Sequence, residues 1–262
     1  MNVAPLATSP RTLPHSSSDA LAAKIVNLRT LLQRIERDHS PAAFASSFGA
    51  EDMVLTDLIA REFRNIKIFT LNTFRLPKQT LALVDVVRKK YDVHIDVYAP
   101  TAESVENFER RNGHFSMYDN IDNRKACCQL RKVEPLKRAL TRKKAWLTGL
   151  RREQAPTRQN LGESEFDAAH GITKFNPLID WRDNDVWAYI RAHNVPYNAL
   201  HDQGYPSIGC EPCTRAIKPD EDVRAGRWWW ENSDAKECGL HTQAIDASRP
   251  NVNRAKNVGA VA

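Results

Sequence analysis

The sequence has no apolar run close to the roughly eighteen residues that a membrane-spanning helix requires. Residues 1–18 are rich in Pro, Ser and Thr and lack the apolar centre of a secretory signal, so they predict a flexible N-terminal arm. Together these absences favour a cytoplasmic protein that has no membrane contact.

Two common nucleotide-binding signatures are also missing. The chain contains neither the Gly-Lys-Ser/Thr ending of a Walker A loop nor a G-x-G-x-x-G fingerprint. The sequence also lacks a strong excess of one charge, because it has 38 Lys and Arg residues and 32 Asp and Glu residues. The net charge is +6 at pH 7. This excess is compatible with nucleic acid or with a phosphorylated small molecule, and net charge alone does not choose between them.

Cysteine is scarce, and its placement is informative. Of five cysteines, Cys127 and Cys128 are adjacent, Cys210 and Cys213 form a C-x-x-C pair, and Cys238 is left over. A disulfide framework is typical of small secreted chains and does not suit this one. Adjacent cysteines make a poor second zinc knuckle, whereas an iron–sulfur cluster tolerates varied spacing. Spacing alone nevertheless leaves zinc and iron–sulfur as open alternatives.

A chain of 262 residues that is 42% hydrophobic is long enough for one domain with a full core. Strand-like and helix-like hydrophobic spacing alternate along it, without internal repeats, which predicts an α/β fold with a mostly parallel twisted sheet flanked by helices. We expect the domain at residues 19–230 and a mobile C-terminal segment at 231–262. The expected helices are Asp19–Arg37, Pro77–Tyr91, Glu103–Arg111, Cys128–Thr141 and Asp183–His193, and the expected strands are Ala42–Ser46, Lys67–Leu71, Val93–Tyr98, Lys144–Thr148 and Ile172–Leu178.

Two loops at expected strand ends are candidates for anion binding. The small-residue loop Ser46–Asp52 leads into a helical pattern that begins at Met53, an arrangement that aims backbone N–H groups at an anion. Many such turns bind nothing, so this loop alone is a weak signal. Arg151 and Arg152 follow the strand that ends at Thr148, and at the ligand end of a sheet they favour anion binding over a solvent-facing role.

Three motifs together resemble the assimilatory adenylyl-sulfate (APS) reductases, close relatives of the phosphoadenylyl-sulfate (PAPS) reductases. These motifs are Cys127-Cys128, Cys210-x-x-Cys213 and Glu237-Cys238-Gly239-Leu240-His241. The resemblance extends from about Ser40 to His241 and implies a PP-loop fold of the adenine nucleotide alpha-hydrolase-like class. Asn72 and Phe74 depart from the Asp and Gly that the family usually has at those positions.

The resemblance implies reduction of APS to sulfite and AMP in assimilatory sulfate reduction, through an S-sulfonated cysteine and with thioredoxin or glutaredoxin as reductant. It implies one [4Fe-4S] cluster per chain on Cys127, Cys128, Cys210 and Cys213. The implied catalytic residues are Cys238, His241 and Lys132. The implied substrate-binding residues are Ser46, Ser47, Phe48, Gly49, Glu51, Asp52, Arg75, Arg151, Arg152, Arg224 and Arg227.

Other functions remain as alternatives. A PAPS reductase or a dual APS/PAPS reductase is the nearest, although a cluster is usually absent from PAPS reductases. A metal-binding nucleic-acid module would explain the basic charge and the cysteine pairs but leaves Cys238 without a purpose. An RNA-thiolating PP-loop enzyme is a further alternative. We expect no nucleic-acid partner, and the oligomeric state stays open, a homo-oligomer included.

Overall fold

The strands form one mostly parallel sheet, as expected. The computed structural model describes residues 18–231, whose six strands lie in the order β3-β2-β1-β4-β6-β5. Neighbouring strands pair in parallel except β5, which is antiparallel to β6. The strands are β1 (Ala42–Ala45), β2 (Lys67–Leu71), β3 (Ile95–Tyr98), β4 (Ala145–Leu147), β5 (Ser164–Asp167) and β6 (Ile172–Phe175).

Helices cover both faces of this sheet, and the strand period of two decides which side chains they meet. Phe44 and Leu147 pack on one face with α1, α2, α3 and α7, whereas their neighbours Ala43 and Trp146 pack on the other with α6. Burying a side chain as large as Phe44 contributes roughly 1.5–3 kcal/mol. The helices are α1 (Ser18–Asp38), α2 (Ala50–Glu62), α3 (Lys78–Tyr91), α4 (Ala102–Asn112), α5 (Ile121–Cys128), α6 (Glu134–Ala139) and α7 (Asp183–Ala192).

Most expected elements are present with small shifts at their ends, but β5 is an addition. Its sequence, Ser-Glu-Phe-Asp, is short and polar, and Phe166 within it is 71% exposed. An edge strand that buries so little has no hydrophobic alternation to reveal it. Only its pairing with β6 makes it a strand.

The expected helix Cys128–Thr141 is not one regular helix. The two cysteines instead end α5, and a π-helical turn, η2 (Gln129–Val133), separates them from α6. Pro135 lies in the first turn of α6 and has no N–H to donate to the carbonyl four residues earlier. A regular α-helix therefore cannot continue through this stretch, and the wide turn falls directly after the cysteine pair.

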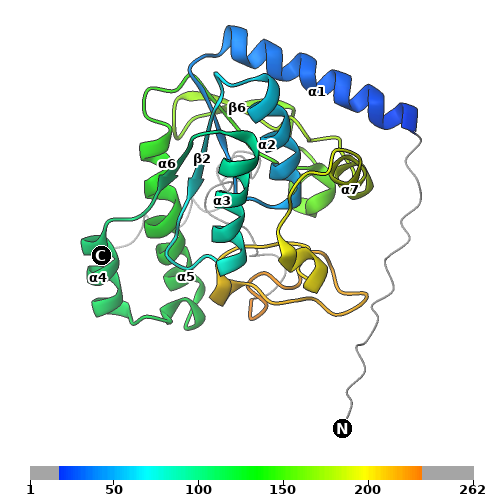
Figure 1. The fold of residues 1–262 in the computed structure, drawn as a ribbon. Coiled ribbons are helices and arrows are strands. Elements are labelled where there is room, and N and C mark those ends of the chain that lie inside the picture. Colours follow the sequence, from blue (N-terminus) through cyan, green and yellow to red (C-terminus); the bar gives the residue numbers. More distant parts are fainter. Residues whose placement is uncertain (1–17, 232–262) are drawn as a thin grey trace, which may run out of the picture.

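The segment after α7 folds back against α5. Short 3-10 turns at Ala199–Gln203 (η5) and Glu211–Cys213 (η6) lead through this segment, which is yellow to orange and passes near α5 in Figure 1. Arg124 of α5 forms an ion pair with Glu231 at its far end. Within residues 18–231, no helix combines the length and the apolar character that a membrane span requires.

Candidate active site

A pocket of about 240 Å³ lies where the parallel strands end. Loops that follow β1, β2 and β4 line it, as expected for a ligand site of a parallel sheet. Nine of the predicted catalytic and substrate-binding residues line this pocket: Ser46, Ser47, Gly49, Glu51, Asp52, Lys132, Arg151, Arg224 and Arg227. The tertiary structure thus brings together side chains from four separate parts of the sequence.

The loop after β1 is ordered by Asp52 in the first turn of α2. The Ser47 backbone N–H and its hydroxyl both donate to Asp52 Oδ2, at 2.5 and 2.7 Å. Burial raises the pKa of Asp52 to about 7, helped by the charge of Glu51 and opposed by the hydrogen bonds from Ser47. Near neutral pH this carboxyl group therefore changes between its protonated and charged forms. It does so beside the backbone of the loop after β1, which is expected to bind a phosphate.

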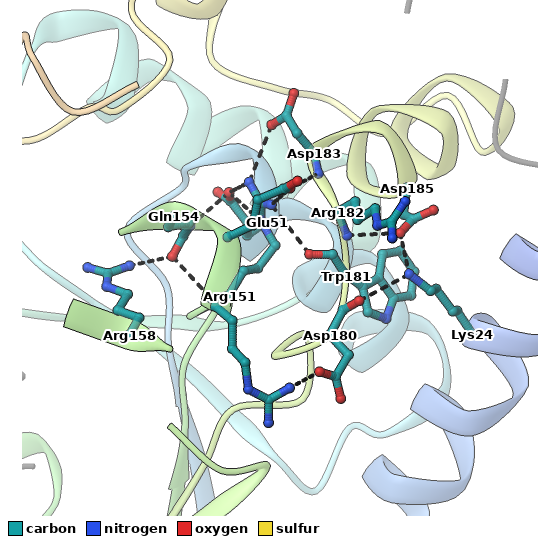
Figure 2. Close-up of polar contacts among 12 residues, drawn as sticks. Lys24, Glu51, Arg151, Gln154, Arg158, Asp180, Trp181, Arg182, Asp183 and Asp185 are labelled. Atoms are coloured by element: carbon teal, nitrogen blue, oxygen red, sulfur yellow. Dashed lines mark hydrogen bonds and ion pairs between the residues drawn. The ribbon is translucent and has the colours of Figure 1, made fainter. Parts of the chain in front are cut away.

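Arg151 does not stand as an isolated cation. Its Nε and Nη2 donate to Oε1 of Glu51 at 2.9 and 2.8 Å, and Glu153 and Asp183 pair with the same guanidinium at 3.0 and 3.3 Å. Figure 2 shows these groups converging from α2, the loop after β4 and the start of α7. Burial alone would raise the pKa of Glu51, but the charge and hydrogen bonds of Arg151 bring it below its ordinary value. Arg151 therefore positions Glu51, and the carboxylates of Glu51, Glu153 and Asp183 balance its charge.

Three predicted substrate contacts lie outside the lining of this pocket. Phe48 is fully buried in the large core, with a backbone φ of 59°. Arg75 turns toward α4, where it pairs with Glu109 at 3.0 Å. Arg152 pairs with Asp180. Each of these side chains has a partner or a core position outside the pocket, and the substrate contacts expected of them stay predictions.

Positively charged side chains gather at the other end of the pocket. Lys132 reaches it from η2, and Arg224 and Arg227 reach it from the segment after η6. Arg227 is 7% exposed and donates to the carbonyl of Ile208 at 3.2 Å, which fixes its guanidinium in the wall. This end can hold an anion, and guanidinium groups suit the oxygen atoms of phosphate and sulfate.

The four paired cysteines line one small cavity beside this basic end. All are 7–8% exposed, and the cavity also contains Arg131, Lys132 and Trp228. Thr73 Oγ1 lies 3.3 Å from Cys210 Sγ. Burial and the neighbouring Cys210 raise the pKa of Cys213 to about 12, so a free thiol there is protonated at neutral pH. Lys132, Cys210 and Trp228 line both the cavity and the large pocket.

The donor chemistry of this cavity fits a cluster. Four thiols surround one space, whereas no three His, Cys, Asp or Glu side chains among residues 18–231 are placed to hold a single metal ion. A polynuclear iron–sulfur centre distributes its thiolates over several iron atoms, so its ligands need not converge on one point. Four buried thiols around one cavity are thus a donor set that fits an iron–sulfur cluster.

Trp228 closes the cavity between two guanidinium groups. Arg124 and Arg227 each lie 4.7 Å from the centre of its rings. Arg124 is fully buried and makes two hydrogen bonds of 2.8 Å to Glu231. These contacts attach the segment that precedes Cys238 to α5.

Sequence reasoning missed several lining residues, among them Gln154, Arg158 and His201. Gln154 donates to Glu51 at 2.8 Å and accepts from Arg158. Burial lowers the pKa of His201, and its Nε2 has no hydrogen-bond partner within the described chain. Gln154 and Arg158 closely follow the predicted pair Arg151 and Arg152, and this proximity is the signal that could have found them. Cys238 and His241 lie outside the described residues.

Comparison with known proteins agrees with this geometry. A family model for the phosphoadenosine phosphosulfate reductase domain matches residues 41–216. An adenosine 5'-phosphosulfate reductase from Allochromatium vinosum is 51% identical over 245 residues, covering 94% of this chain and 96% of that protein. One from Burkholderia cepacia is 53% identical over 225 residues, covering 86% and 90%. The crystal structure of a PAPS reductase from Candida auris, a phosphate complex, is similar with a TM-score of 0.61 and 30% identity, covering 75% of this chain and 97% of that one.

Proposed function

Because this chain belongs to the phosphoadenosine phosphosulfate reductase domain family, we propose that it reduces adenylyl sulfate to sulfite and AMP with a protein dithiol as electron donor. Relatives named adenosine 5'-phosphosulfate reductase match it over most of both chains. The observation that carries the proposal is that Lys132 and Cys210 line both the pocket at the strand ends and the cavity of the four cysteines.

We further propose that Cys127, Cys128, Cys210 and Cys213 hold one [4Fe-4S] cluster. The support is that all four are buried around one cavity, with basic and aromatic side chains as its other lining. When bound, such a cluster would supply structural support and a fixed charge beside Lys132. No electron from it is needed, since a cysteine and an external dithiol account for both electrons.

In this proposal the phosphosulfate group of APS binds at the basic end of the pocket. Lys132, Arg224 and Arg227 would balance its charge, and the thiolate of Cys238 attacks the sulfur atom. A sulfur–sulfur bond forms, the bond from that sulfur to the bridging oxygen breaks, and AMP leaves. A thiolate of thioredoxin or glutaredoxin then attacks Cys238 Sγ, sulfite leaves, and the second thiol of the reductant resolves the mixed disulfide.

The proposed chemistry calls for a reducing compartment. The cysteine ligands, Cys238 and the donor dithiol must all remain reduced between turnovers, which the cytoplasm provides. We therefore propose a cytoplasmic enzyme of sulfate assimilation.

Anaerobic purification followed by a sulfite assay tests the function. The protein should absorb broadly near about 400 nm and form sulfite and AMP in equal amounts from APS and a reduced dithiol protein. Cys238→Ser should abolish sulfite but retain iron and nucleotide binding, whereas Cys210→Ser should lose iron as well. A colourless zinc protein, or one that forms no sulfite from APS, would contradict the proposal.

A further inference from the structure

Three exposed aromatic side chains lie together beside the four-cysteine cavity. Phe115, Tyr118 and Trp229 are 59%, 40% and 39% exposed. The rings of Phe115 and Tyr118 are 6.3 Å apart and stacked, and those of Tyr118 and Trp229 are 6.2 Å apart. We call these three side chains the aromatic patch.

The patch is built from two distant parts of the sequence. Phe115 and Tyr118 come from the turn between α4 and α5, and Trp229 comes from the segment after η6. Trp230 packs beneath, 4.5 Å from the Tyr118 ring. A single exposed aromatic residue is ordinary, but several that meet from separate segments are typical of an interaction surface.

The patch has a fixed position relative to the cysteines. The Tyr118 hydroxyl donates to the carbonyl of Pro212, which lies between Cys210 and Cys213, at 2.5 Å. Trp229 directly follows Trp228, which lines the cavity. The patch therefore has a rigid support and lies outside the catalytic pocket.

The length of the chain beyond this point indicates what covers the patch. Trp229 precedes Cys238 by only nine residues, and nine residues span at most about 30 Å when fully extended. Any protein that reduces Cys238 must therefore work within that distance of Trp229. Tyr and Trp side chains offer a large apolar area at low entropic cost, which suits a brief encounter with an apolar protein face.

We propose that the aromatic patch is the docking surface for the protein dithiol that reduces S-sulfonated Cys238. The inference rests on the proposed function. The docked thiolate attacks Cys238 Sγ, the sulfur–sulfur bond breaks and sulfite leaves with its electron pair. The second thiol then releases Cys238 as a thiol, and the reductant departs as a disulfide. A small dithiol such as dithiothreitol performs the same exchange without the patch.

Reductant-dependent kinetics test the assignment with Phe115→Ser, Trp229→Gln and the double variant. Phe166→Ser is the matched control, because Phe166 is 71% exposed on β5, the edge strand opposite β3. With APS saturating, kcat/KM for the protein dithiol should fall at least tenfold in the double variant and stay unchanged in the control. The rate with dithiothreitol, the KM for APS and the iron content should match wild type.

Each other outcome overturns the assignment in a recognisable way. An equal loss with dithiothreitol would assign the patch to the fold or to catalysis. Slower single-turnover S-sulfonation would indicate that the chain's own C-terminal segment covers it, and an altered oligomeric state in solution would indicate a second copy. Unchanged kinetics would show that nothing docks there. Failure of wild type to form sulfite with either reductant would instead refute the proposed function.

Discussion

Arg151 illustrates why a basic side chain at the end of a strand need not bind an anion. Its place after a strand predicts an anion contact, but Glu51, Glu153 and Asp183 surround its guanidinium. A cation held by three carboxylates has little positive potential left for a substrate. Arg151 instead acts on the ligand indirectly, because it fixes the orientation of Glu51 in the pocket. Other basic side chains that line the pocket, Lys132 among them, are left to bind an anion.

The buried pair of Arg124 and Glu231 predicts a large loss of stability on Glu231→Gln. Arg124 is fully buried, and Glu231→Gln removes the carboxylate that pairs with it, which costs about 3–5 kcal/mol. The exposed pair of Arg34 and Glu163 is the control, where Glu163→Gln should cost at most about 1 kcal/mol. The free energies of unfolding of the two variants are compared at equal cofactor content. Equal losses would show that the buried pair stabilises the fold no more than the exposed pair does.

Asp52 predicts a pH-dependent stability that an Asn at this position should remove. Its pKa is about 7 in the folded protein and 3.8 in the unfolded chain, so the folded protein binds the proton more tightly. The stability from this group is fully present below pH 3.8 and is lost as the pH rises through 7, by roughly 1.4 kcal/mol per pH unit between these values. Asp52→Asn keeps an acceptor for Ser47 without the charge.

Thermal unfolding of wild type and Asp52→Asn at pH 5, 6, 7 and 8 checks this. The difference in midpoint should favour the variant increasingly as the pH rises to about 7 and should level off above it. Parallel curves for the two proteins would show that Asp52 does not titrate in this window.

At the scale of elements, the segment after α7 depends on close backbone approaches. A Cβ on Gly226 would lie 2.2 Å from the backbone oxygen of Arg215, and one on Gly209 would lie 2.3 Å from Nη2 of Arg227. The first contact is with rigid backbone, whereas the second is with the end of a long side chain that can move. These two glycines let the segment pack tightly enough to place Arg227 in the pocket wall.

Gly209→Ala is therefore expected to displace Arg227 while leaving the fold in place. The kcat/KM for APS should fall toward that of Arg227→Ala, on the order of tenfold or more, since a charge-assisted contact to the substrate is lost. The double variant should be no worse than Arg227→Ala alone. Additive losses in the double variant would mean that Gly209 acts through another route.

At the scale of the whole molecule, two sites share one wall. The large pocket lies at the strand ends, the cysteine cavity lies between η2 and η6, and Lys132, Cys210 and Trp228 belong to both. This wall brings together a π-helical turn and the segment after α7. A substitution at the cysteines is therefore expected to affect substrate binding through these shared side chains.

This arrangement predicts a preference for APS over PAPS. Lys132 lies beside the cysteines, whereas carboxylates neutralise Arg151, so a 3'-phosphate near Arg151 would gain little from that guanidinium. Steady-state kcat/KM with each nucleotide and one reductant measures the preference, and each tenfold ratio corresponds to about 1.4 kcal/mol. Equal or higher efficiency with PAPS would favour the alternative function of a PAPS reductase.

The sequence by itself determined the strand and helix periods, the parallel sheet and the cysteine pairs, because these depend on neighbours along the chain. Tertiary structure decided the partners of the charged groups. Glu51 and Arg151 lie 100 residues apart, and Arg124 and Glu231 lie 107 apart. No local pattern reports such pairs, since they exist only once the intervening segments pack. For the same reason, the turn of Arg75 toward α4 was visible only in the folded chain.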